Sequence, residues 1–160
     1  MIHGLRTSGG QAEWYRNRRV DTPALTEGKA VLTDQGTIDL TASAAGTSVI
    51  AHTGRILALQ EINPPFELTS ELAALGAYDY DGALKAMMTA LPRIFPRTGE
   101  LLFFGSSPLA PHLTYHIADV QGRLVHGEFL NGSGPTSSTV GNRPPWSPST
   151  ASKPISRRRQ

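Results

Sequence analysis

Short apolar runs separated by turn-forming residues dominate the hydrophobic pattern of the chain. Gly, Pro, Asn and Asp recur at intervals of roughly ten residues, and few segments show the 3.6-residue periodicity of an amphipathic helix. This pattern predicts an all-β protein built from successive antiparallel strands, as in the blades of a propeller.

Three hairpins are predicted from their turns, each of which contains a glycine that can supply a positive φ. The turns are Thr53-Gly54, residues 97–100 and residues 120–123. The strands that they join or precede are residues 49–52 and 55–59, residues 101–104, and residues 113–119 and 124–130.

Two further elements are less regular. Residues 67–75 are the one candidate for a short helix, with Thr69 or Ser70 as N-cap and Gly76 just past the end, although a loop is the favoured interpretation. Residues 30–33 are predicted to form a strand.

The composition changes abruptly at Asn131. Residues 131–160 contain five prolines, ten Ser or Thr and three large apolar residues, which are Val140, Trp146 and Ile155. Such a segment buries too little apolar surface to offset its ordering entropy. We therefore expect a folded unit over residues 1–130 and a disordered tail over residues 131–160. A frameshift or a degenerate end, rather than an evolved linker, is the expected origin of the tail.

The charge distribution also separates residues 1–130 from residues 131–160. The tail carries five basic residues and no acid, so the net charge of +2 leaves −3 on residues 1–130. A mildly acidic folded part argues against nucleic-acid binding. Arg16, Arg18 and Arg19 around Trp14 and Tyr15 could stack on bases, but contacts between blades are the favoured role for this stretch.

The chain has no cysteine and no apolar run near the roughly 18 to 20 residues of a membrane-spanning helix. The first observation excludes disulfides and thiolate metal sites and is typical of a reducing compartment. We therefore expect a soluble cytoplasmic protein without a transmembrane segment.

Several short motifs occur in a fixed order between residue 1 and about Thr136. They are residues 1–5, 13–20, 52–61, 65–68, 75–80, 89–104, 113–116 and 122–126. Together they resemble the carotenoid cleavage oxygenases, the family that includes the lignostilbene dioxygenases and the retinal-pigment-epithelium isomerase. The resemblance implies part of a seven-bladed β-propeller, with about two to three blades in this chain.

The resemblance also implies a chemistry. Family members hold a non-haem Fe(II) with four histidines and use O2 to cleave a C=C bond of a carotenoid, apocarotenoid or stilbene. The first histidine lies in a Thr-Ala-His-Pro motif that aligns with residues 89–92, where Leu91 stands in its place. The segments of the other three lie beyond the end of the resemblance. This chain is therefore expected to bind no Fe(II) and to contain no catalytic residue.

Glu61 matches the family's acidic residue that accepts a hydrogen bond from an iron-ligating histidine. The alternative is a partly buried carboxylate near a strand end. Both interpretations remain open from the sequence.

The other candidates have mainly structural interpretations. His112 and His116 have the spacing of metal ligands on a helix, but the residues between them indicate a strand. His3, His52 and His126 are interpreted as hairpin or strand-surface residues. Phe103 and Phe104 are both expected in the core.

Met1 matches the interior of a family motif whose preceding Gly-Asp-Gly is absent, so the chain is expected to begin at an internal methionine. The leading hypothesis is an inactive fragment of a cleavage dioxygenase, with open strand edges that favour self-association. The alternatives are a non-enzymatic β-rich fragment that binds a hydrophobic ligand or pairs through open strand edges with a chain supplying the missing blades, and a pseudogene product that does not accumulate.

Overall fold

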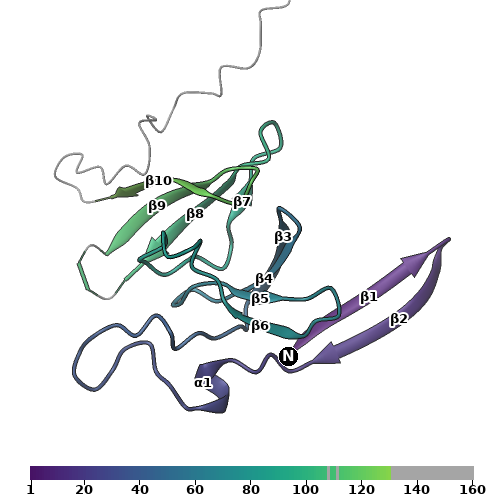
Figure 1. Cartoon of the computed structure of the whole chain (residues 1–160), viewed down its shortest axis with the longest axis horizontal. Coiled ribbons are helices and arrows are strands. Elements are labelled where there is room, and N and C mark those ends of the chain that lie inside the picture. The colour runs from purple at the N-terminus through teal and green to yellow at the C-terminus, as the bar shows by residue number, and fades with distance from the viewer. Residues whose placement is uncertain (108, 111, 131–160) are drawn as a thin grey trace, which may run out of the picture.

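The computed structural model describes residues 1–107, 109–110 and 112–130 (Figure 1). Within them the regular structure is almost entirely β, as predicted, and the one helix is α1 (Pro23–Thr26). The strands are β1 (Ile2–Ser8), β2 (Gln11–Arg18), β3 (Ser48–His52), β4 (Arg55–Leu59), β5 (Phe66–Leu68), β6 (Ala74–Ala77), β7 (Arg93–Ile94), β8 (Leu101–Ser106), β9 (Leu113–Ala118) and β10 (Leu124–Phe129).

The strands form three antiparallel sheets. β3–β4–β5–β6 and β7–β8–β9–β10 are four-stranded meanders in which strands consecutive in sequence pair, whereas β1 and β2 form a separate hairpin. A four-stranded meander is the unit of a propeller blade. The hairpin extends away from the two meanders in Figure 1, so the fold is two blade-like sheets with an adjoining hairpin, which confirms the partial-propeller prediction.

All three predicted turns are confirmed. β3 and β4 pair from Ser48–Leu59 to His52–Arg55 across a two-residue turn in which Thr53 and Gly54 have φ of 52° and 79°. Positive φ at both central positions is the geometry that matches the twist of the flanking strands. The loops before β8 and β10 likewise place Gly99 and Gly122 at positive φ.

The helix considered for residues 67–75 does not form, and the favoured loop interpretation is confirmed for residues 69–73. β5 ends at Leu68 and β6 begins at Ala74, so only a tight turn fits between two strands that pair with each other. Thr69 does act as a cap, but of this turn: its Oγ1 accepts the backbone N–H groups of Glu71 and Ala73 at 3.3 and 3.0 Å. A hydroxyl at this position supports a turn as well as a helix start.

The strand predicted over residues 30–33 is also wrong. A single bridge between Leu32 and Ile38 is formed there, inside a loop that joins α1 to β3. Thr33 Oγ1 lies 2.8 Å from Thr37 Oγ1, and the Thr33 N–H donates to the Thr37 carbonyl at 2.9 Å, which closes a local turn. The short apolar run therefore has no neighbouring strand to pair with.

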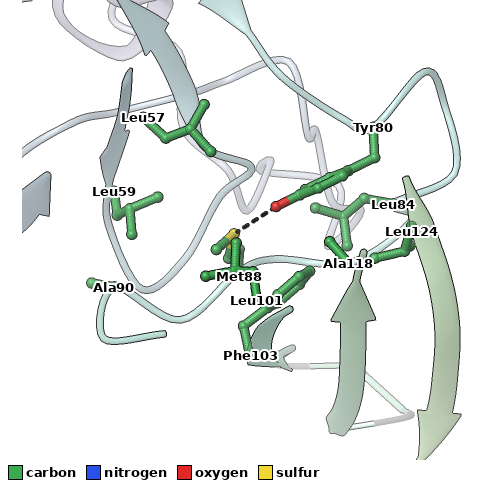
Figure 2. Close-up of a cluster of buried hydrophobic side chains, with 10 residues drawn as sticks. All are labelled: Leu57, Leu59, Tyr80, Leu84, Met88, Ala90, Leu101, Phe103, Ala118 and Leu124. Atoms are coloured by element: carbon green, nitrogen blue, oxygen red, sulfur yellow. Dashed lines mark hydrogen bonds between the residues drawn. The ribbon is translucent and has the colours of Figure 1, made fainter. Parts of the chain in front are cut away.

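The main core lies between the two meanders (Figure 2). Its buried residues come from β4, β8, β9, β10 and the segment before β7, and they are Leu57, Leu59, Tyr80, Leu84, Met88, Ala90, Leu101, Phe103, Ala118 and Leu124. The Tyr80 hydroxyl donates to the Met88 sulfur at 4.0 Å, so this polar group has a partner inside the core.

Phe103 and Phe104 lie on opposite faces of β8, which corrects the expectation that both are in the core. Phe103 is 1% exposed and faces the other meander, whereas Phe104 is 47% exposed. Successive side chains of a strand point to opposite faces, and only one face of β8 is covered by described residues.

The β1–β2 hairpin is attached through a second cluster of buried residues, which are Ile2, Val20, Ala58, Phe66, Leu68 and Leu72. The Arg16 guanidinium lies 4.8 Å from the Trp14 ring centroid and pairs with Glu71 on the β5–β6 turn. Arg16 of β2 therefore makes a contact between the hairpin and the β3–β6 sheet.

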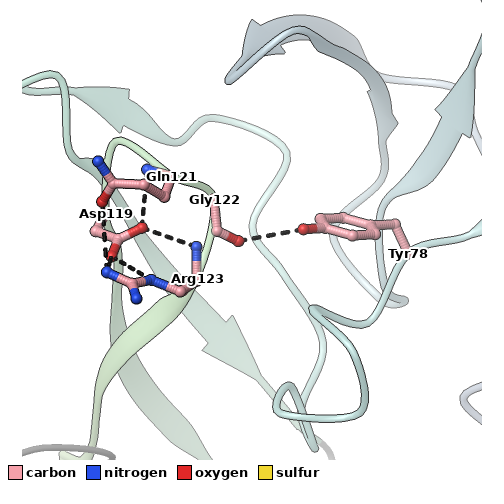
Figure 3. Close-up of polar contacts among 5 residues, drawn as sticks. All are labelled: Tyr78, Asp119, Gln121, Gly122 and Arg123. Atoms are coloured by element: carbon pink, nitrogen blue, oxygen red, sulfur yellow. Dashed lines mark hydrogen bonds and ion pairs between the residues drawn. The ribbon is translucent and has the colours of Figure 1, made fainter.

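A polar contact at the sheet interface links the segment after β6 to the β9–β10 turn (Figure 3). The Tyr78 hydroxyl donates to the Gly122 carbonyl at 3.2 Å. That turn is held by Asp119 Oδ1, which accepts the backbone N–H groups of Gln121 and Arg123, both at 2.9 Å. Burial acts to raise the pKa of Asp119, but its hydrogen bonds, chiefly with Arg123, outweigh burial and lower the pKa overall.

We expect Tyr78→Phe to lower the free energy of unfolding by about 1 kcal/mol, the usual net value of one such hydrogen bond. Urea denaturation of both proteins measures it. Tyr15→Phe is the matched control, because Tyr15 is exposed and its hydroxyl contacts the exposed His3. An unchanged stability in Tyr78→Phe would mean that the Gly122 contact contributes nothing.

Candidate functional site

Leu91 occupies an exposed position just before β7. Its side chain is 72% exposed, and its backbone N–H donates to Thr89 Oγ1 at 3.4 Å. The segment is fixed on both sides, because the Thr89 N–H donates to the Phe104 carbonyl at 2.7 Å and the Ala90 carbonyl accepts from the Ser48 hydroxyl. The backbone therefore holds residue 91 firmly, but the side chain presented there has no lone pair.

Glu61 lies two residues after the end of β4 and is exposed. The strand-end position agrees with the structural alternative, whereas the partial burial it assumed is wrong. The backbone carbonyl of Glu61 accepts the Ser106 hydroxyl at 3.2 Å. Within the described ranges no hydrogen bond or ion pair of the Glu61 carboxylate is found, so the role of this acid stays a prediction.

The five histidines are dispersed. His3 and His112 are exposed, whereas His52, His116 and His126 are buried. His52 and His126 both lie in hairpins, as the sequence analysis allowed, but neither is a strand-surface residue. His52 Nε2 lies 3.1 Å from the Gly99 carbonyl of the other meander, and His126 Nε2 lies 3.5 Å from Glu128 Oε2.

The residues present do not fit a four-histidine Fe(II) site. Among residues 1–107, 109–110 and 112–130, no three His, Cys, Asp or Glu side chains come together in a way that could hold a metal ion. The strand interpretation of His116 is confirmed by β9, and Leu91 offers no donor atom at the position that the resemblance assigns to the first ligand.

A cavity of about 520 Å³ is a feature that the sequence analysis missed. One wall is the β8–β10 face that carries Gly105, Thr114 and His116, and the opposite side is formed by residues of the 83–87 segment with Ile38 and Leu40. Most of the lining residues are apolar. Gly105 allows the close approach, since an added Cβ would lie 2.4 Å from Thr114 Oγ1 and 2.5 Å from the Met87 carbonyl.

His116 is the main buried polar group of this wall. It is 7% exposed and stacks on Phe103, with ring centroids 5.0 Å apart. Its Nε2 lies 2.8 Å from Thr114 Oγ1, and that hydroxyl donates its one proton to the Gly105 carbonyl at 3.3 Å. Thr114 must then accept from Nε2–H, so the network assigns the proton to Nε2 and leaves Nδ1 as an acceptor.

Nδ1 of His116 is buried and has no hydrogen-bond partner among the described residues. Burial, with a smaller contribution from the nearby His126, lowers the pKa of His116 to about 4. The ring is therefore neutral near pH 7, and Nδ1 keeps its lone pair.

This pKa predicts a pH dependence of stability. Below pH 6.5, the ordinary pKa of histidine, His116 binds a proton in the unfolded chain but stays neutral in the folded chain. The free energy of unfolding therefore falls as the pH drops from about 6.5 towards 4. Between pH 7 and pH 5 we expect a loss of about 2 kcal/mol from this residue. Urea titrations at both pH values should show a smaller loss for His116→Gln, and equal losses in the two proteins would contradict the assignment.

The sequence model of the retinal pigment epithelial membrane protein family matches residues 1–146. The chain belongs to this family, the carotenoid cleavage oxygenases. The match extends past Thr136, which is further than the motifs alone indicate. Residues 131–160, and with them the predicted tail, lie outside the described part of the structure.

Relatives in the carotenoid cleavage oxygenase family are similar along much of the chain. An isoeugenol monooxygenase of Pseudomonas nitroreducens is 41% identical over 51% of this chain and 18% of its own length. A carotenoid cleavage oxygenase of Mycobacterium tuberculosis is 41% identical over 63% of this chain and 21% of its own. The crystal structure of Pseudomonas brassicacearum lignostilbene dioxygenase superposes with a TM-score of 0.62 and 32% identity, covering 78% of this chain and 29% of that one.

The chain therefore spans less than a third of each of these three relatives. The similarity identifies the family and the fold. In the described ranges, no helix is long and apolar enough to cross a membrane.

Proposed function

We propose that this chain is the part of a non-haem iron dioxygenase that builds two propeller blades and the adjoining hairpin. The reaction of the whole enzyme is the oxidative cleavage of a C=C bond of a carotenoid, apocarotenoid or stilbene with O2. The relatives support this substrate class, since they include a carotenoid cleavage oxygenase and a lignostilbene dioxygenase. On its own, the chain does not catalyse the reaction.

The proposal that the chain does not catalyse the reaction on its own rests on the leucine at position 91. Fe(II) in this family requires imidazole donors, and an exposed leucine offers none at the position of the first. The backbone around it is fixed by the Thr89 and Ala90 hydrogen bonds. The chain thus supplies the scaffold of a metal site without supplying the ligands.

A cleavage assay tests this function. Residues 1–160 are incubated with Fe(II), O2 and a hydroxylated stilbene, and aldehyde products are measured by chromatography. We expect no products above the protein-free control, either for the wild-type chain or for Leu91→His, because a single histidine does not make a four-histidine site. Aldehyde production by the wild-type chain would overturn the proposal.

A second candidate function is non-enzymatic pairing with another chain that supplies further blades. The observation in its favour is the outer face of β8 and β9, where Leu102 pairs with Ile117 and Phe104 pairs with Tyr115. Phe104 and Leu113 are exposed there although both are large and apolar. Co-expression with the remaining blades of a relative, followed by size-exclusion chromatography, should give a complex, and separate elution would exclude this pairing.

The proposal also places the protein in the cytoplasm. The absence of cysteine from the sequence supports this placement, because cysteine-rich frameworks are typical of oxidising compartments. Fluorescence microscopy of a tagged chain checks the location.

A further inference from the structure

The outer face of the β7–β10 sheet, the face turned away from the main core, is apolar along its middle. In an antiparallel pair, residues directly opposite each other point to the same face of the sheet. Leu102 pairs with Ile117 and Phe104 pairs with Tyr115, and the Phe104 and Tyr115 rings lie 5.5 Å apart. Phe104 is exposed, so the described residues leave the middle of this face open.

The two edge strands of the same face carry opposite charges. Arg93 of β7 lies opposite Leu102, and Glu128 of β10 lies opposite Tyr115, so both charged side chains are on the outer face. The strand order β10–β9–β8–β7 separates them by three strand spacings, about 14 Å. Exposed Arg93 therefore cannot reach Glu128 of its own chain, and it forms no ion pair with any described acidic side chain.

A two-fold axis can bring these charges together between two copies of the chain. If the axis lies in the interface and runs parallel to the strands, β10 of one copy lies over β7 of the other. Each Arg93 then faces Glu128 of the other copy, and the apolar middle strands pack on each other. An axis across the strands would place Arg93 over Arg93 and Glu128 over Glu128, and such like charges oppose association. The charge pattern therefore favours the first arrangement.

We propose that the outer face of the β7–β10 sheet pairs two copies of this chain into a two-fold symmetric dimer, with an Arg93–Glu128 ion pair on each side of an apolar centre. Six-residue strands are about 20 Å long and four of them span about 15 Å, so the flat area is about 300 Å² per copy. Interfaces of this size are at the low end for specific association, so we expect a weak dimer. The pairing uses no metal ligand and no further blade, so it does not depend on the proposed dioxygenase function.

Sedimentation velocity of residues 1–160, from low micromolar to near millimolar concentration at pH 7, tests the dimer. We expect a monomer that converts to a dimer as the concentration rises. A protein that stays monomeric throughout would overturn the proposal, whether the face is open or covered by residues 131–160 of the same chain. The cleavage assay does not depend on this result, so the two proposals can fail separately.

Charge exchange tests the arrangement of the two copies. Arg93→Glu should weaken the dimer about tenfold, because symmetry replaces two attractive contacts by two repulsive ones. Glu128→Arg should have the same effect, and the double variant should restore the wild-type affinity. Arg18→Glu is the matched control, since Arg18 is exposed on the separate β1–β2 hairpin and its replacement should change the affinity less than about twofold. A double variant that remains as weak as the single ones would contradict the arrangement.

A measurement on the wild-type chain covers the case in which these variants do not fold. Methyl NMR spectra recorded at increasing concentration report which side chains change their surroundings on association. We expect the Leu102 and Ile117 resonances to shift, and those of exposed Leu5 and Val49 to stay in place. Val49 lies on the edge strand β3. Shifts at Val49 without shifts at Leu102 and Ile117 would indicate association through a strand edge and would overturn the proposed face.

Discussion

Replacing Phe103 by alanine is expected to lower the free energy of unfolding by about 3 to 5 kcal/mol, the usual loss for a buried phenylalanine. Phe103 is 1% exposed, with ring centroids 5.8 Å from Tyr80 and 5.0 Å from His116. It thus packs against the segment that links the two meanders, inside the main core. The expected loss is comparable to the whole stability of a marginal domain, about 5 kcal/mol. Urea denaturation followed by circular dichroism measures it.

Phe104→Ala is the matched control for this prediction. The residue type and strand are the same, but Phe104 is on the outer face and 47% exposed, so we expect a loss below about 1.5 kcal/mol. If the two variants lost equal stability, the outer face would have to be as well covered as the core. That result would contradict the assignment of the two faces of β8.

The second large effect is expected at Gly105. An added Cβ would lie 2.4 Å from Thr114 Oγ1 and 2.5 Å from the Met87 carbonyl, and the latter is backbone that cannot rotate away. We expect Gly105→Ala to cost about 1 to 3 kcal/mol through overpacking. Thermal unfolding of the variant measures the loss.

Gly46→Ala provides the comparison, because no atom lies within 4 Å of an added Cβ there and no positive φ is required. Its stability should change by less than about 0.5 kcal/mol, or rise slightly because alanine restricts the unfolded chain. A similar loss in both variants would show that glycine is needed for reasons other than the contact with Met87.

The hairpins could be predicted from the sequence because their determinants are local. Gly54, Gly99 and Gly122 each permit a positive φ next to an apolar run, and a turn needs little else. The predictions failed where long-range contacts determine the secondary structure. Thr69 was ambiguous between a helix cap and a turn until the pairing of β5 with β6 excluded the helix.

Burial was the least predictable property. Phe103 and Phe104 are identical in type and adjacent in sequence, and only the position of the opposite sheet decides which is covered. The same holds for His52 and His126, which are buried by contacts with distant segments. Composition alone cannot indicate such contacts.

In the candidate site, too, local features could be predicted and long-range contacts could not. The prediction that no iron ligand stands at position 91 comes from one motif, because the family resemblance assigns that position directly. The cavity could not be predicted, since it is formed by β8–β10 together with residues 83–87 and the Ile38–Leu40 region. The hydrogen-bond state of His116 depends on Thr114 and Gly105 in three dimensions.

The most direct test of the central claim, that this chain belongs to the oxygenase family without carrying its metal site, is the stoichiometry of Fe(II) binding. Anaerobic equilibrium dialysis of residues 1–160 against Fe(II), with metal determined by mass spectrometry, measures it. The account predicts much less than one Fe(II) per chain, both in the wild-type chain and in Leu91→His. One tightly bound Fe(II) per wild-type chain would contradict it.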